Sequence, residues 1–313
     1  DGYLVWQGER TGKLARSADR LNPDVVLVGG ELGAAEAIAR AAQRLQRHVA
    51  GEVSRHLGAL VALKNRTGAD SGLDGLARGI AWRLVEAGGA MPRHELASDI
   101  AQLSAHERRQ LRSAGVRIGE HAVYLPALLK PRAAGLNTLL HALHAGEAEA
   151  RFRPAPGRVC LPAPQGRPAT EMASAGYLVC GSLAVRIDML ERLADAVREA
   201  RKPHPRGWFA LDDTMMALLG LPMDGLEEIV RALGYTRVKK AADSTPDLWS
   251  ATRKARRKPA DITRPATPPD AASPFARLAE LDLPRAPARR PANSGRKPRR
   301  RRNARAAKGS GPT

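Results

Sequence analysis

The sequence predicts a mostly α chain with small β wings (α+β). Tandem winged-helix-like units follow a small β/helical unit, and a disordered basic C-terminal tail ends the chain. Three patterns predict this: long stretches of apolar residues at helical spacing, short hairpin-like runs after them, and a Pro-, Arg- and Ala-rich composition beyond Thr245. We divide the chain into five segments: small strands plus a long helix (1–72), a winged-helix-like unit (73–147), a linker (148–170), a second winged-helix-like unit (171–245) and the tail (246–313).

The first segment is predicted from a change in hydrophobic period. Over 33–63 the apolar residues recur three, four or seven positions apart, which predicts an amphipathic helix or a helix pair broken near Gly51 or Gly58. Its other face carries a stripe of arginines, for which a solvated face is a simpler explanation than a nucleic-acid contact: Arg40, Arg44, Arg47 and Arg55. Three short strands are expected before it, at 3–6, 13–15 and 25–28.

The second segment reads as three helices followed by a hairpin, the order of a winged helix. Ser104 and Glu107 have the spacing of a capping box, which predicts a helix ending near 114. Two extended runs within 116–125 then form the hairpin, and Pro126 ends the strand pairing. Further helices are expected at 73–87, from Pro92 to 101, and at 136–145.

The fourth segment is predicted as a shorter version of the same arrangement. Its elements are strands at 176–180, 182–185 and 235–239 and helices at 187–200, 211–219 and 223–233. Within the tail, 273–281 is a candidate short helix that docks on a partner through Phe275, Leu278 and Leu281, which recur at intervals of three. Residual hydrophobicity in a disordered tail is an equally good explanation of this island.

The charge of the chain is concentrated in its tail. Of the net charge of +19, residues 250–313 supply +14 through 18 basic and 4 acidic residues. Dense, flexible basic runs neutralise phosphates and release counterions, which gives salt-sensitive binding without sequence specificity. The candidate contacts are Arg253, Lys254, Arg256, Arg257, Lys258, Arg296, Lys297, Arg299, Arg300, Arg301 and Arg302.

Several classes of protein are disfavoured. The 313 residues contain no signal peptide and no apolar run of 18 or more, so a secreted or membrane-associated protein is not expected. Two cysteines are too few for a disulfide framework, and we expect reduced thiols in a cytoplasmic protein. The absence of an initiator Met before Asp1 suggests a piece of a longer polypeptide.

No catalytic, cofactor or metal site is expected in this chain. Gly8 to Leu14 fails as a phosphate loop, because the glycine spacing is one short and Leu14 replaces the hydroxyl that would hold magnesium. Asp212 and Asp213 lie at a helix start, where capping explains them. A zinc site is disfavoured because it would need His141, His144, Cys160 and Cys180 to converge.

Parts of the sequence resemble the C-terminal region of alphaproteobacterial superfamily 2 helicases that are similar to the mitochondrial degradosome RNA helicase. The resemblance is carried by the 273–281 island before a basic end and by five segments: 76–87, 115–119, 123–131, 184–193 and 231–235. The resemblance implies a parent protein with two RecA-like motor domains before Asp1. ATP and Mg would bind to those domains, and no ATPase residue can be assigned to a position of this chain.

The sequence therefore predicts a non-catalytic accessory region of an ATP-dependent RNA helicase, which binds RNA (or DNA) through its phosphates. Arg117, Lys130 and Arg132, in or beside the wing of the first unit, are the candidate contacts of the folded part. Two alternatives stay open: a stand-alone winged-helix regulator that binds DNA, and an interaction module that docks on a ribonuclease or ribosome.

Overall fold

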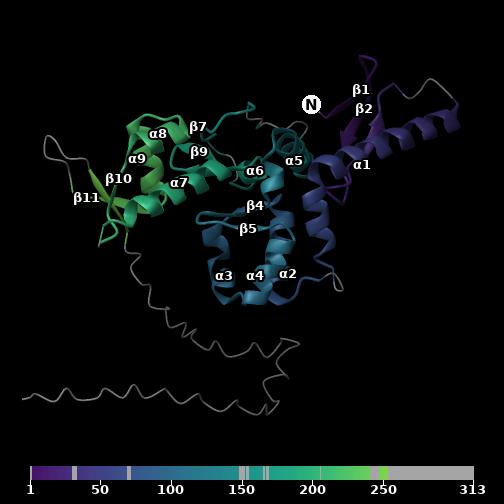
Figure 1. Cartoon of the computed structure of the whole chain (residues 1–313). Coiled ribbons are helices and arrows are strands. Elements are labelled where there is room, and N and C mark those ends of the chain that lie inside the picture. Colours follow the sequence, from purple (N-terminus) through teal and green to yellow (C-terminus); the bar gives the residue numbers. More distant parts are fainter. Residues whose placement is uncertain are drawn as a thin grey trace, which may run out of the picture. The chain divides into compact units, whose positions relative to one another are not determined.

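The computed structural model describes residues 2–29, 34–68, 72–147, 152, 155–164, 166, 169–204, 206–239 and 247–252. Within them the chain combines α-helices with four small three-stranded antiparallel sheets (Figure 1), which confirms the predicted α+β class. The chain divides into two units between Lys254 and Ala255, and every described residue belongs to the first.

The N-terminal part forms as predicted, from three strands followed by a long helix: β1 (Tyr3–Trp6), β2 (Glu9–Ala15), β3 (Asp24–Leu27) and α1 (Ala35–Asn65). The helix lies directly on the sheet, because a Cβ added to Gly12 would meet Leu45 of α1 at 3.0 Å. α1 leaves helical geometry at Leu57 (φ −110°, ψ 15°), one residue from the break predicted at Gly58.

The first helix–sheet unit (75–124) follows. Its elements are α2 (Gly75–Glu86), β4 (Ala90–Pro92), the 3-10 helix η1 (Arg93–Leu96), α3 (Ala97–Gln102), α4 (Ala105–Ser113), β5 (Arg117–Ile118) and β6 (Ala122–Tyr124). The strands pair in the order β4-β6-β5. Ser104 and Glu107 form the predicted capping box, in which each side chain accepts a hydrogen bond from the other residue's backbone N–H.

One hydrophobic core joins the first two predicted segments. The 3-10 helix η2 (Pro126–Leu129) and α5 (Pro131–His144) follow β6. Leu60 of α1, Leu84 of α2 and Leu111 of α4 are fully buried in the same core, which also takes in Leu14 of β2 and Leu143 of α5. The boundary predicted between residues 72 and 73 therefore does not separate two cores.

The next elements begin inside the predicted linker and end in a long helix: β7 (Cys160–Pro162), α6 (Ala169–Ser174), β8 (Tyr177–Cys180), β9 (Leu183–Arg186) and α7 (Ile187–Arg201). The linker prediction is wrong for residues 160–162, since Cys160 pairs with Val185 and β7 is one of the two outer strands of the sheet β7-β9-β8.

The last elements are short: β10 (Phe209–Ala210), α8 (Asp213–Leu219), α9 (Met223–Ala232), β11 (Tyr235–Lys239) and β12 (Leu248–Ala251). Asp212 caps α8 by accepting the N–H of Met215 at 2.9 Å, as its position predicts. The disordered tail predicted from residue 246 is wrong for β12, because Trp249 is fully buried and its strand lies between β10 and β11.

The second helix–sheet unit, which we define as α7 through β12, repeats the order of the first. Each unit runs helix, strand, two helices, strand, strand, apart from the extra 3-10 turn of the first. In each, the last strand lies between the other two, as β4-β6-β5 and as β10-β12-β11. The repeat therefore starts at Ile187 and ends at Ala251, not at 171 and 245 as predicted.

Candidate nucleic-acid interface

The first helix–sheet unit contains a hollow of about 470 Å³ whose wall is rich in arginine. Among the described residues that line this arginine hollow, none is acidic. The guanidinium groups come from η1, α4 and β5, and belong to Arg93, Arg108, Arg112 and Arg117. A concave surface of a single charge sign concentrates counterions of the opposite sign, so the hollow is suited to an anion.

α4 places two of these arginines on one side of the hollow. Arg108 and Arg112 are four residues apart and so lie on the same face of the helix, while Leu111 beside them is fully buried in the core. Gly115 (φ +81°) has the left-handed conformation that ends the helix. The chain then turns into β5, whose first residue is Arg117.

Two of the four guanidinium groups are fixed by backbone carbonyls. Arg93 donates to the carbonyl of Gly119. Arg108 donates to the carbonyls of Ile100 and, at 3.4 Å, Leu103. These two side chains are therefore held in place as part of the wall.

The other two guanidinium groups face solvent. Arg112 and Arg117 are exposed, and neither forms an ion pair within the described part of the chain. An arginine without an acidic partner retains its full set of donors for the two oxygens of a phosphate. The arginine hollow thus combines two exposed guanidinium groups with two that are held by backbone carbonyls.

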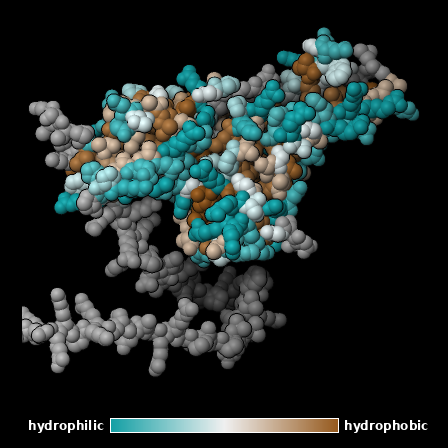
Figure 2. All heavy atoms as spheres, viewed as in Figure 1, coloured by the Kyte–Doolittle hydropathy of each residue, from teal (hydrophilic) through white to brown (hydrophobic). Residues whose placement is uncertain are grey.

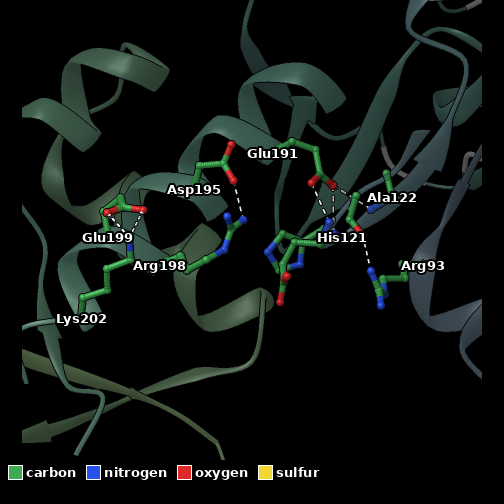
Figure 3. Close-up of polar contacts among 10 residues, drawn as sticks. Arg93, His121, Ala122, Glu191, Asp195, Arg198, Glu199 and Lys202 are labelled. Atoms are coloured by element: carbon green, nitrogen blue, oxygen red, sulfur yellow. Dashed lines mark hydrogen bonds and ion pairs between the residues drawn. The ribbon is translucent and has the colours of Figure 1, made fainter. Parts of the chain in front are cut away.

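The tip of the β5–β6 hairpin is held by a buried carboxylate of α7 (Figure 3). Glu191 accepts the backbone N–H groups of Glu120, His121 and Ala122 at 2.6, 2.9 and 2.9 Å. Only 6% of Glu191 is exposed. A Cβ at Gly119 would lie 2.3 Å from the Glu191 carboxyl carbon, so a larger residue there would displace this carboxylate from its N–H partners.

The hairpin tip is therefore held from two elements, by Glu191 on its N–H groups and by Arg93 on its carbonyl (Figure 3). Burial lowers the pKa of His121 in the tip below its ordinary value; the Glu191 and Glu120 carboxylates oppose this shift and Arg93 adds to it. A tip turned inward in this way leaves the flank of the hairpin, with Arg117, as its solvent-facing part.

The structure brings only one of the three predicted wing residues to the arginine hollow. Arg117 lines it, whereas Arg132 lines a different cavity of about 480 Å³ together with His48, Glu52 and other residues of α1, α5 and β1. Lys130 is exposed at the N-cap of α5 and does not line the hollow.

Sequence reasoning missed the other three arginines of the hollow. Arg108 and Arg112 could have been found from their four-residue spacing on a helix with a capping box. Arg93 left no such signal, because its part in the site depends on a tertiary contact with Gly119.

The predicted tail contacts lie outside the described residues. This applies to the basic candidates in 253–258 and 296–302 and to the candidate docking residues Phe275, Leu278 and Leu281. Their roles therefore stay predictions from the sequence.

Other chemistry finds little support among the described residues. They contain no group of three or more His, Cys, Asp or Glu side chains placed to hold a metal. Burial raises the pKa of the Cys160 thiol to about 11 and that of Cys180 to about 12, which keeps both protonated and unreactive at neutral pH. Of the residues that a zinc site would need, His141 lies 3.4 Å from the Arg20 guanidinium, beside the end of α2.

None of the helices in the described ranges is long and apolar enough to cross a bilayer.

Comparison with models of known protein families finds none that matches this chain. Comparisons with curated proteins and with solved structures likewise return no match. The functional argument therefore rests on the residues and their geometry.

Proposed function

We propose that this chain binds nucleic acid and is a non-catalytic accessory region of an ATP-dependent RNA helicase. The observation that supports nucleic-acid binding most directly is the arginine hollow, which Arg93 and Arg108 line together with the exposed Arg112 and Arg117. Guanidinium groups match the geometry of phosphate oxygens, and contacts to phosphate carry no sequence information. The target is therefore an RNA or DNA backbone rather than a defined base sequence.

The two helix–sheet units are, in this proposal, winged-helix modules. Their shared element order and their strand orders β4-β6-β5 and β10-β12-β11 support this. In the first unit, nucleic acid would meet α4 and Arg117 on the flank of the hairpin. The tip itself is occupied by Glu191, which counts against a stand-alone regulator that inserts this wing into a DNA groove.

The helicase part of the proposal is supported by the resemblance alone. Its five segments fall on α2, on β5, on β6 with η2, on β9 with α7, and on the end of α9 with the start of β11. ATP, Mg and strand separation belong to the motor domains that the resemblance implies, and no residue of this chain is assigned a part in them. The accessory region would grip the strand and guide it towards the motor.

The arginine hollow is tested by the double variant Arg112→Ala/Arg117→Ala of the full chain. The measurement is RNA binding on filters over a range of salt concentrations. We expect weaker binding and a smaller dependence of log K on log salt, with the slope reduced by about 1.5 for two lost phosphate contacts. The reason is that each lost contact no longer releases condensed counterions.

A matched control removes the same charge elsewhere. Arg55 and Arg198 are exposed, and each forms an ion pair with an acidic residue one helical turn away. The double variant Arg55→Ala/Arg198→Ala should therefore show the same slope of log K against log salt as the wild type. Equal slopes for the hollow variant and the wild type would overturn the proposed interface. Equal losses in both double variants would show a nonspecific effect of net charge, which also overturns it.

A further inference from the structure

The β1–β2 hairpin carries two aromatic rings, each covered by a cation. The Arg10 guanidinium lies 4.4 Å from the ring centroid of Tyr3, and the Lys13 amine lies 5.3 Å from the same ring. The Arg44 guanidinium of α1 lies 5.4 Å from the ring of Trp6, whose side chain is 56% exposed. The hairpin thus presents stacked aromatic and cationic groups at the surface.

The sheet face around Tyr3 is open and partly apolar. Tyr3 pairs across the strands with Lys13, which pairs with Val26, so the three side chains form one row. Val5 and Val26 are 61% and 57% exposed. Figure 2 shows apolar residues beside hydrophilic ones over β1 and β2. This row borders a hollow of about 450 Å³ that reaches the C-terminal end of α5.

The charges at this face favour an anionic occupant. Arg10 and Lys13 on this face, and Arg44 beside Trp6 on the α1 side of the sheet, form no ion pair with any described residue. Arg16 lines the hollow and adds a fourth cation, while Glu147 is the one acidic side chain among the described residues that line it, so positive charge predominates. Charge complementarity therefore favours a polyanion over a neutral or basic peptide, and the aromatic rings favour one with exposed flat groups.

Single-stranded nucleic acid has both properties. Its unpaired bases present π-faces that stack on Tyr, Trp and Arg side chains, while Lys and Arg neutralise its phosphates. In a duplex the same faces are buried within the base stack. The basic runs of the tail, 253–258 and 296–302, contain no aromatic residue and so offer no stacking of their own.

We propose that the β1–β2 hairpin is a base-stacking site for single-stranded RNA or DNA, with Tyr3 and Trp6 as the platforms and Arg10, Lys13 and Arg44 as phosphate partners. The inference rests on the proposed nucleic-acid binding and adds base stacking at the hairpin to the phosphate contacts of the arginine hollow. The arginine hollow binds backbone in any form, whereas the hairpin selects unpaired bases.

The test uses the full chain and a labelled oligouridylate of about ten nucleotides, a length suited to one small binding module. We expect Trp6→Ala to weaken binding about tenfold, the loss of one stacked base, and Trp6→Phe to retain affinity but lose quenching of intrinsic fluorescence. Trp82→Ala is the control, because Trp82 on α2 is equally exposed at 57% and lies outside the hairpin. The control should bind as the wild type does.

The outcomes separate the two proposals. If Trp6→Ala binds the oligouridylate like the wild type while Arg112→Ala/Arg117→Ala loses salt dependence, the stacking site is overturned and the proposed function stands. If Trp6→Ala loses as much affinity for a duplex of equal length, stacking on unpaired bases is overturned as well. If the wild type binds neither probe, the proposed function itself is overturned.

Discussion

At the scale of single residues, the most consequential contact is made by a carboxylate that has no ion pair within the described part of the chain. Glu191 is buried, and its partners are the three backbone N–H groups of the hairpin tip. Hydrogen bonds to a charged acceptor are stronger than neutral ones, and each N–H left unpaired in the interior costs free energy. This one side chain therefore fixes where the hairpin flank, with Arg117, is presented.

Replacing Glu191 should destabilise the protein strongly. In Glu191→Ala the N–H groups of residues 120–122 lose their acceptor, and we expect the free energy of unfolding to fall by about 3 kcal/mol. Urea denaturation followed by circular dichroism measures the change. Glu199→Ala, on the same helix, is the control, since Glu199 pairs with Lys202 at the surface and its loss should leave the midpoint almost unchanged. Similar midpoints for the two variants would contradict the role given to Glu191.

Of the three candidate residues in or beside the wing, only Arg117 lines the arginine hollow, and its hairpin was recognisable in the sequence. Lys130 and Arg132 are close to it in sequence, but the chain turns through η2 before reaching them, and Arg132 lines a separate cavity with residues of α1. Proximity along the chain predicted a common surface that the 3-10 turn prevents.

At the scale of elements, long periodic segments and most short strands were predictable, whereas the strands β4, β7, β10 and β12 were not. The apolar residues of α7 recur at helical spacing, and the capping box at Ser104 marks the start of α4. β10 and β12 are too short to show alternation, and their pairing is decided by tertiary contacts. β4 was missed for another reason: Pro92, a favourable first residue for a helix, instead ends a strand.

β12 is the element whose loss should be most damaging. It lies between β10 and β11 and places the fully buried Trp249 in the core of the second helix–sheet unit. A chain that ends at Thr245 loses both, which leaves two unpaired strand edges and removes a buried aromatic worth about 3–5 kcal/mol. We expect thermal unfolding of this chain to be broad and to begin at lower temperature.

The matched control for β12 is a chain that ends at Thr252. It retains the strand and removes only residues beyond it, so calorimetry should give the midpoint of the full chain. Identical unfolding of the two shortened chains would show that β12 does not belong to the folded unit. The pair thus locates the end of the fold to within a few residues.

At the scale of the whole molecule, charge is unevenly distributed along the chain. Residues 1–252 hold 33 basic and 28 acidic residues, a net charge of +5, against +14 for the remainder. Because the positive and negative charges of residues 1–252 nearly balance, we expect this part to contact nucleic acid only locally, as at the arginine hollow. The strongly basic remainder instead raises the concentration of any polyanion around it. The two contributions should therefore differ in their dependence on salt.

The chain that ends at Thr252 also separates these contributions, because it should remain folded. We expect it to bind RNA more weakly than the full chain and with a salt dependence reduced by several units of slope, since each lost phosphate contact removes about 0.7. Adding Arg112→Ala/Arg117→Ala should lower the slope further, because the hollow lies in the remaining body. Filter binding from low to moderate salt measures both steps.

A full-length chain in which every Lys and Arg beyond residue 252 is changed to Gln separates the effect of charge from that of chain length. We expect it to bind RNA with the same salt dependence as the shortened chain. A wild-type slope in either chain would contradict an electrostatic role for the tail.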